Sequence, residues 1–416
     1  MADKVKTSMS KPMTNNVAFL WDESFLWGLM AYRAMKGLNL PFDLIRTEDI
    51  KTGALNNYKM LFVPGGWASN KSKSLEESGL KAIREFVSNG GNYLGFCGGA
   101  GLATGAKDCI GLLNIKRRPT RERVPSFSGR IHLNVNEHPL WREGKARLSP
   151  AIFHAWWPSQ FIVEDENIKI LATYGDALPD AFSSDLNVGD VDSKLRWEEL
   201  EEVYQINLNP KRLKNEPAVI EGTYGKGKVI LSLVHFDTPE DMNGQQVLAN
   251  LWGYLAGEKT DFIKHGVKNI VNPDVGARRA VPLQNLCAEL ISLGERNFLW
   301  FWRNSMLLQW RRGVRGLEYN TLYIMMKEIT ARRGERPFAP TVDRLKDLLV
   351  PFIDKAKRLL LLERRAMQRG HITYERCDDP EIQKLRAELF SESKSHGGKF
   401  KELIDEVDKL LFALLT

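Results

Sequence analysis

The sequence predicts an α/β fold, with a parallel sheet and helices on both faces, followed by a mostly α-helical C-terminal domain. From Asn16 onwards, short strand-like runs alternate with segments of helical spacing, the pattern of a parallel sheet. After Lys259 the strand pattern disappears and helical spacing continues alone. A chain of 416 residues also exceeds the usual size of one hydrophobic core, so two domains are expected.

In the first half, predicted strand segments repeatedly alternate with predicted helix segments. In order, we expect a strand at Val17 to Trp21, a helix at Phe25 to Lys36, strands at Phe42 to Ile45 and Tyr58 to Val63, a helix at Leu75 to Asn89 and a strand at Asn92 to Phe96. The alternation fails between Gly175 and Pro217, which we interpret as an acidic insertion lying over the carboxyl edge of the sheet. It resumes with a hairpin turn at Tyr224 to Lys228, a strand at Val229 to Val234 and a helix at Val247 to Leu255.

The second half is predicted to be helical and basic. The expected helices are Leu286 to Leu293, Phe298 to Trp310, Leu317 to Ile329, Val342 to Gln368 and Phe400 to Leu415. The residues before position 261 include 31 cationic and 31 acidic side chains, and those from position 261 onwards 28 and 21, so the net charge of +7 lies in the second half. The basic run Arg311 to Arg315 is interpreted as a solvated helix face or a set of internal salt bridges, with an acidic partner or nucleic acid as alternatives.

Composition and cysteine usage favour a folded protein in a reducing compartment. The four cysteines form no C-x-x-C pair, so we expect neither a metal site nor a disulfide framework, and we expect no cofactor. Residues 1–14 form a flexible N-terminal tail without the apolar core of a secretory signal, and no apolar run is long enough to span a bilayer. These features predict a cytoplasmic protein without a membrane span.

The sharpest motif is the segment Gly95 to Gly101, Gly-Phe-Cys-Gly-Gly-Ala-Gly, which comes directly after a predicted strand. A nucleophile on a strand-to-helix elbow needs a strained backbone and small neighbours, and Gly95 and Gly99 meet that need. The positive end of the following helix favours the thiolate of Cys97. This pattern indicates a cysteine nucleophile.

Acyl transfer also requires oxyanion donors and a general base. The backbone N–H groups of Gly98 and of the Pro64 to Trp67 loop are the candidate donors, because glycine lets a peptide turn toward the substrate. His235 ends a buried-type strand, and Asp237 stands two residues later, where it can orient the imidazole.

Together these motifs resemble the class I glutamine amidotransferase-like superfamily, with its G-x-C-x-G elbow and later H-x-E. The similarity is greatest to the amidotransferase-like domain at the N-terminus of biotin-protein ligases. It covers residues 15–258 and implies a flavodoxin-like arrangement, with residues 262–416 as a separate basic helical domain. The resemblance implies Cys97 as nucleophile, His235 as base, Asp237 as orienting acid, and the amides of Gly66 and Gly98 as oxyanion hole.

The chain departs from that pattern at two positions. Glutaminases carry Gln where this chain has Gly101, which removes part of a glutamine pocket, and Asp237 replaces the usual Glu. Glu240 is therefore a candidate for the triad acid. Glu23, after the first strand, is a further candidate accessory residue, because a related branch of the superfamily places a carboxylate there.

Two functions remain open from the sequence. The first is a cysteine-dependent amidase or hydrolase that forms an acyl-thioester on Cys97 from a small-molecule amide or carbonyl substrate. The second is a non-catalytic ligand-binding or scaffold protein. In both, the helical domain mediates association with a protein partner or with a second copy of the chain, and nucleic acid is not the expected partner.

Overall fold

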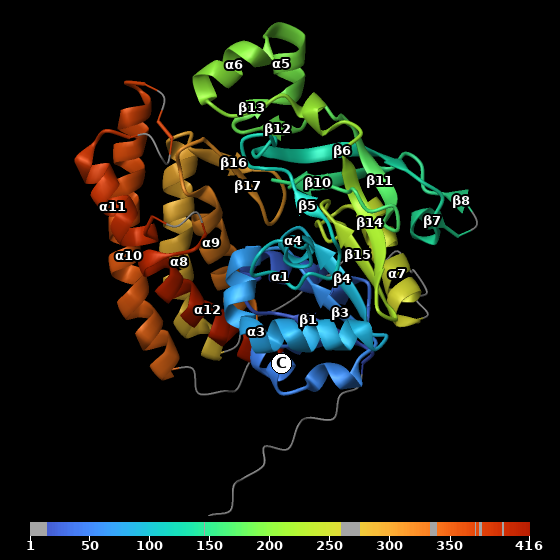
Figure 1. The fold of residues 1–416 in the computed structure, drawn as a ribbon. Helices are drawn as coiled ribbons and strands as arrows, with labels where there is room; N and C mark the ends of the chain where they lie inside the picture. Colours follow the sequence, from blue (N-terminus) through green and yellow to red (C-terminus); the bar gives the residue numbers. More distant parts are fainter. Residues whose placement is uncertain are drawn as a thin grey trace, which may run out of the picture.

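The computed structural model describes residues 15–144, 146–258, 275–332, 339–370, 372–373, 377–392 and 395–416. The predicted tail at residues 1–14 and the predicted join between the domains at residues 259–261 lie outside the described residues. The described chain is a mixed α/β protein with one large central sheet and a group of helices beside it (Figure 1).

The first half builds a five-stranded parallel region in the order β2-β1-β3-β4-β15. The strands are β1 (Val17–Leu20), β2 (Asp43–Ile45), β3 (Met60–Val63), β4 (Asn92–Phe96) and β15 (Gly227–Ser232). β1 and β3 are continuously buried apolar runs, as expected for strands covered on both faces. The helices of this part are α1 (Phe25–Gly37), α2 (Thr47–Lys51), α3 (Ala68–Ser88), α4 (Gly98–Leu102) and α7 (Met242–Ala256), and Figure 1 shows α3 lying across one face of the strands.

The parallel sheet predicted for the whole first half is correct only for these five strands. Beyond β15 the sheet continues antiparallel through β14 (Pro217–Tyr224), because the β14–β15 hairpin reverses the chain at Gly225, whose φ is +58°. The remaining strands of this extension are β6 (Phe127–Val135), β9 (Ile152–Trp156), β11 (Lys169–Ala177), β12 (Phe182–Ser183) and β13 (Leu186–Asn187).

Short elements complete the first half. They are the two-residue strands β5 (Lys116–Arg117), β7 (Arg142–Glu143), β8 (Ala146–Arg147) and β10 (Phe161–Ile162), the 3-10 helices η1 (Ala54–Asn57), η2 (Pro139–Trp141) and η3 (Pro210–Leu213), and the helices α5 (Val188–Lys194) and α6 (Trp197–Tyr204). The segment interpreted as an insertion, 175–217, thus supplies the edge strands β12 and β13 and the helices α5 and α6.

The part of the second half that the structure describes is helical apart from one hairpin. Its helices are α8 (Val275–Arg296), α9 (Gly316–Ala331), α10 (Ala339–Met367), α11 (Pro380–Phe390) and α12 (Gly398–Leu415). The helix predicted at Phe298 to Trp310 is wrong, because this segment forms the antiparallel strands β16 (Trp300–Trp302) and β17 (Leu308–Trp310). The side chain of Asn304 accepts the N–H groups of Met306 and Leu307, which closes the turn in place of a helical backbone bond.

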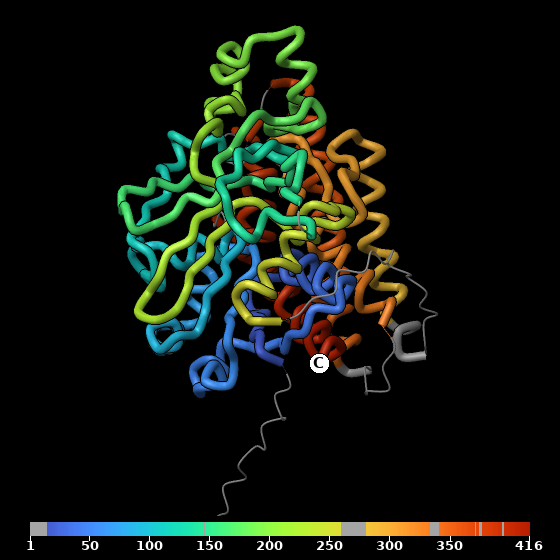
Figure 2. Tube along the Cα trace, turned by 90° about the vertical axis from the view of Figure 1, so that its right-hand side faces the viewer, coloured from blue at the N-terminus to red at the C-terminus, as the bar shows by residue number. Residues whose placement is uncertain are grey.

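The two halves pack against each other along α1, α9 and α12 (Figures 1 and 2). Arg33 of α1 forms an ion pair with Glu328 of α9, and the indole N–H of Trp21 donates to Asp408 of α12 at 2.7 Å. Among the helices that the structure describes, none combines the length and apolar character that a bilayer crossing requires.

Candidate active site

Cys97 stands on a strained elbow between β4 and α4. Its φ of 48° and ψ of −103° lie outside the regions that L-residues favour. Two backbone hydrogen bonds hold this conformation: the N–H of Cys97 donates to the carbonyl of Ser232 in β15 at 2.8 Å, and its carbonyl accepts the N–H of Gly101 at 2.9 Å. Cys97 is partly exposed. The strand and helix therefore place this cysteine at the carboxyl edge of the sheet.

The glycines around Cys97 are required by close backbone approach, as expected from the sequence. A Cβ at Gly99 would lie 2.0 Å from the carbonyl oxygen of Val63, and one at Gly95 would lie 2.7 Å from the backbone of Gly99. A Cβ at Gly98 would lie 1.8 Å from the carbonyl oxygen of Gly66. We call Pro64 to Trp67 the double-glycine loop. The elbow and this loop are in direct contact.

His235 and Asp237 are both fully buried and face each other, with 3.0 Å between the imidazole Nδ1 and the carboxylate Oδ1. Burial of the imidazole opposes its protonation, but the Asp237 carboxylate and the nearby Cys97 side chain outweigh this and raise the pKa of His235 to about 10. Within the described residues, Nε2 of His235 is buried and makes no hydrogen bond. Nε2 is therefore available for a hydrogen bond on the side of the ring away from Asp237.

Two neighbouring segments, the double-glycine loop and β9, surround His235. A Cβ at Gly65 would lie 3.1 Å from Cε1 of the imidazole, so the loop needs glycine there. The N–H of His235 donates to the carbonyl of His154 in β9 at 2.8 Å, so the antiparallel extension positions the histidine. Nδ1 of the His154 imidazole lies 2.7 Å from a carboxylate oxygen of Asp241.

The candidate oxyanion donors belong to the same two segments. Gly66 has a φ of +116°, which glycine adopts without strain. Within the part of the chain that the structure describes, neither the N–H of Gly66 nor that of Gly98 donates a hydrogen bond to a backbone or side-chain acceptor. Both groups therefore keep their donor capacity.

A buried lysine beneath the double-glycine loop was not anticipated from the sequence. Lys71 of α3 is fully buried, and its Nζ donates to the carbonyl oxygen of Asp22 at 3.1 Å and to the hydroxyl of Ser24. Burial lowers the pKa of Lys71 to about 7, although the carboxylates of Glu23 and Asp22 oppose that shift. A lysine on the buried helix stripe between Ala68 and Leu75 was the signal that could have revealed it.

The other candidate carboxylates lie in different surroundings. Glu23 accepts hydrogen bonds from Asn70 and from Lys401 of α12, at 3.3 and 2.9 Å. Glu240 is exposed at a φ of +65°, whereas Asp237 is in contact with the imidazole. The geometry thus brings Asp237, rather than Glu240, to His235.

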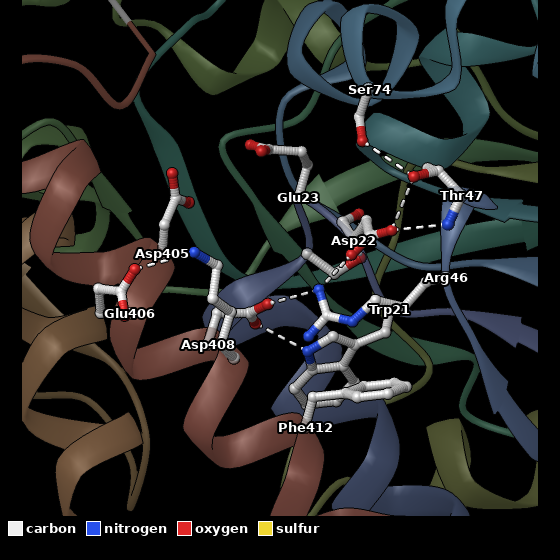
Figure 3. Close-up of polar contacts among 12 residues, drawn as sticks. Trp21, Asp22, Glu23, Arg46, Thr47, Ser74, Asp405, Glu406, Asp408 and Phe412 are labelled. Atoms are coloured by element: carbon white, nitrogen blue, oxygen red, sulfur yellow. Dashed lines mark hydrogen bonds and ion pairs between the residues drawn. The ribbon is translucent and has the colours of Figure 1, made fainter. Parts of the chain in front are cut away.

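A cluster of polar side chains joins the end of β1 to α12 (Figure 3). Asp22 accepts the backbone N–H of Thr47 and forms an ion pair with Arg46, which also pairs with Asp408 at 3.2 Å. The Arg46 guanidinium lies 4.1 Å from the ring centre of Phe412. Burial, reinforced by Asp22 and opposed by Arg46, raises the pKa of Asp408 to about 7.

Three tryptophans from different parts of the chain form a row of ring contacts that begins at His235. The ring of Trp27 lies 4.8 Å from the imidazole and 6.1 Å from Trp157, which stacks on Trp310 of β17 at 4.7 Å. The hairpin of the second half therefore contributes to the surroundings of the candidate site. The structure places no group of three or more potential metal ligands together among the residues it describes.

Comparison with known proteins supports the resemblance over a short segment. Residues 50–109 match the family described as biotin-protein ligase, N terminal, and this segment contains β3, the double-glycine loop and the elbow. No curated protein sequence matches the chain.

Solved structures similar to this chain are distant. A glutamine amidotransferase is 18% identical and matches 59% of this chain and 100% of its own, with a TM-score of 0.36. A GMP synthase-type protein of Thermoplasma acidophilum is 13% identical over 59% of this chain and 96% of its own, with a TM-score of 0.38. A β-galactosidase of Bacillus circulans is 16% identical over 63% of this chain and a third of its own (33%), with a TM-score of 0.36.

Proposed function

We propose that the chain is an amidotransferase-like protein with a cysteine-dependent amidase or hydrolase site. The observations that support this proposal are the strained backbone of Cys97 and the buried His235–Asp237 pair, in which the nearby Cys97 side chain helps to raise the pKa of the imidazole. A histidine whose pKa is raised by a carboxylate holds a proton near neutral pH, and a thiolate beside an imidazolium is a strong nucleophile.

The proposed reaction uses only groups of this site. The sulfur of Cys97 attacks the carbonyl carbon of an amide, and the resulting oxyanion accepts hydrogen bonds from the N–H groups of Gly66 and Gly98. His235 then gives its proton to the leaving amine, and the C–N bond breaks to leave an acyl-thioester. Water, deprotonated by His235, attacks this thioester and releases the acid and the thiol.

Selective alkylation tests the nucleophile. Iodoacetamide at pH 6 should label Cys97 at least tenfold faster than a free thiol, and Cys97→Ser should remove this fast phase. Asp237→Asn should slow it, because His235 without its carboxylate loses the interaction that keeps the imidazole protonated. Cys109→Ser is the matched control, since burial raises the pKa of that second, partly exposed thiol. Labelling of Cys97 at the rate of a free thiol would contradict the proposal.

A non-catalytic ligand-binding or scaffold role is the second candidate. It is favoured by Gly101, where glutaminases carry Gln and where this chain places the guanidinium of Arg117 beside the glycine. A thermal-shift panel of amides and amino acids distinguishes the two roles: ligands that stabilise wild type and Cys97→Ala equally favour simple binding.

We further propose that the parallel strands form a flavodoxin-like core, since their order β2-β1-β3-β4-β15 is that of the doubly wound 2-1-3-4-5 sheet. Residues 15–258 would be the amidotransferase-like domain and residues 262–416 the helical domain. The predicted cytoplasmic location and a protein partner for the helical domain are part of this proposal, and rest on cysteine usage and on the basic charge.

A further inference from the structure

A basic pocket opens beside the elbow helix α4. It has a volume of about 410 Å³, and four of its lining side chains are cationic. These are Lys116, Arg117, Arg118 and Arg123, and none of the lining residues is acidic. A concave site with several cations and no lining carboxylate attracts anions, because its walls concentrate the positive potential.

Two of the four cations are already neutralised. Arg118 donates to both carboxylate oxygens of Glu216, at 2.9 and 3.0 Å, and Lys116 forms an exposed ion pair with Glu164. Because these ion pairs neutralise Arg118 and Lys116, the positive charge of the pocket comes from Arg117 and Arg123.

Arg117 and Arg123 differ from that pair. Arg123 is held by neutral groups, the hydroxyls of Ser159 and Thr120, at 3.0 and 2.6 Å. Its Nε is buried without a hydrogen bond in the described structure. Burial, and then the like charge of Arg117, lower the pKa of Arg123. Two guanidinium groups are thus held near each other, and within the described residues no ion pair joins either of them to a carboxylate.

The pocket adjoins the proposed nucleophile. Nη1 of Arg117 lies 3.1 Å from the position that a Cβ at Gly101 would occupy, and the N–H of Gly101 donates to the carbonyl of Cys97. One helical turn, about 5 Å along the axis, separates Cys97 from Gly101, and the Arg117 guanidinium lies beside Gly101. The N–H of Gly105 also donates to the carbonyl of Ile115, which joins the segment after α4 to the residue before β5; Figure 1 shows the two elements near each other.

We propose that this pocket is an oxyanion-binding subsite, in which Arg117 and Arg123 hold a carboxylate or phosphate group of the molecule whose carbonyl faces Cys97. The inference rests on the proposed function and assigns its substrate class: an acyl compound with a second, anionic end that reaches the guanidinium beside Gly101. Arginine suits this role because its planar fork donates two parallel hydrogen bonds to such a group. The glycine at position 101 leaves the space that the guanidinium fills.

Direct binding to the full chain tests the subsite without any reaction. Calorimetry with inorganic phosphate and with succinate should detect binding of at least one of them, and should show which oxyanion is preferred, while neutral succinamide should not bind. Arg117→Gln and Arg123→Gln should each weaken binding at least tenfold. Arg121→Gln, in the same exposed loop but outside the pocket lining, is the matched control and should bind as wild type does.

A comparison of an anionic with a neutral alkylating reagent tests whether the pocket attracts anions to the sulfur of Cys97. The ratio of the Cys97 labelling rates with iodoacetate and with iodoacetamide should fall at least threefold in Arg117→Gln and stay unchanged in Arg121→Gln. Phosphate should protect wild type from iodoacetate.

The two proposals fail separately. Binding that is retained in Cys97→Ser, together with slow iodoacetamide labelling, would keep the subsite and reject the nucleophile. Fast iodoacetamide labelling without phosphate or succinate binding, and with an unchanged labelling ratio in Arg117→Gln, would overturn the subsite.

Discussion

Asp408 is expected to make the stability of this protein fall as the pH rises. The folded carboxyl has a pKa of about 7, against an ordinary value of 3.8, because it is buried near Asp22. A folded state that binds a proton more tightly than the unfolded state is stabilised below the unfolded pKa, and that stability is lost as the pH rises through the folded pKa. Asp408→Asn removes this titration and keeps an oxygen that can accept the indole N–H of Trp21.

The magnitude follows from the shift. A difference of about three pH units, at about 1.4 kcal/mol per unit, sets an upper limit of about 4 kcal/mol. About two of those units fall between pH 5 and pH 7. Between pH 5 and pH 8, wild type should therefore lose about 3 kcal/mol relative to Asp408→Asn. Arg46 keeps its pairing with Asp22 in the variant, so its charge stays compensated.

Urea denaturation at pH 5 and pH 8, followed by tryptophan fluorescence, measures the difference. Glu402→Gln is the control, because it removes an exposed carboxylate from the same helix, and its pH dependence should parallel that of wild type. Parallel curves for wild type and Asp408→Asn would refute the reasoning, since they would mean that the Asp408 carboxyl titrates alike in the folded and unfolded chain.

Three further predictions follow from contacts at the site and in the helical half. Gly98→Ala should destabilise the fold by about 2 kcal/mol or more and slow alkylation of the elbow cysteine, since its Cβ would meet the carbonyl of the double-glycine loop at 1.8 Å; an unchanged melting temperature and labelling rate would contradict this. Arg386→Met should cost about 3–5 kcal/mol in urea denaturation, because it leaves the buried Glu363 carboxyl uncompensated, and adding Glu363→Gln should restore part of the loss. Trp310→Ala should weaken the packing around Trp157 by about 3 kcal/mol and expose that ring to acrylamide quenching, whereas equal quenching in both proteins would count against the stacking.

The parts predicted well from the sequence depend on local patterns. Apolar runs followed by helical spacing identified β1, β3 and β4, and the glycine pattern identified the elbow at Cys97. The pairing of His235 with Asp237 also followed from their spacing of two residues. Each of these signals lies within a few residues of the feature it predicts.

The parts that were missed depend on contacts between distant segments. The aromatic run at Phe298 to Trp310 was predicted as a helix because a dense apolar run does not distinguish helical from strand periodicity. The segment forms a hairpin, whose turn is closed by the side chain of Asn304. The antiparallel extension follows from strands that pair across long sequence gaps. Lys71 donates to Asp22 in the segment that follows β1, and the ion pair of Glu23 comes from Lys401, 378 residues away, so no local pattern predicts the partner of either residue.

The contact between Trp21 and Asp408 has a consequence for biosynthesis, because the two residues are 387 positions apart. Ribosomes add about 5–20 residues per second, so roughly 20 to 80 seconds pass between the synthesis of Trp21 and that of Asp408. During that interval the indole N–H of Trp21 lacks the acceptor that α12 provides, and Arg46 has only one of its two carboxylate partners.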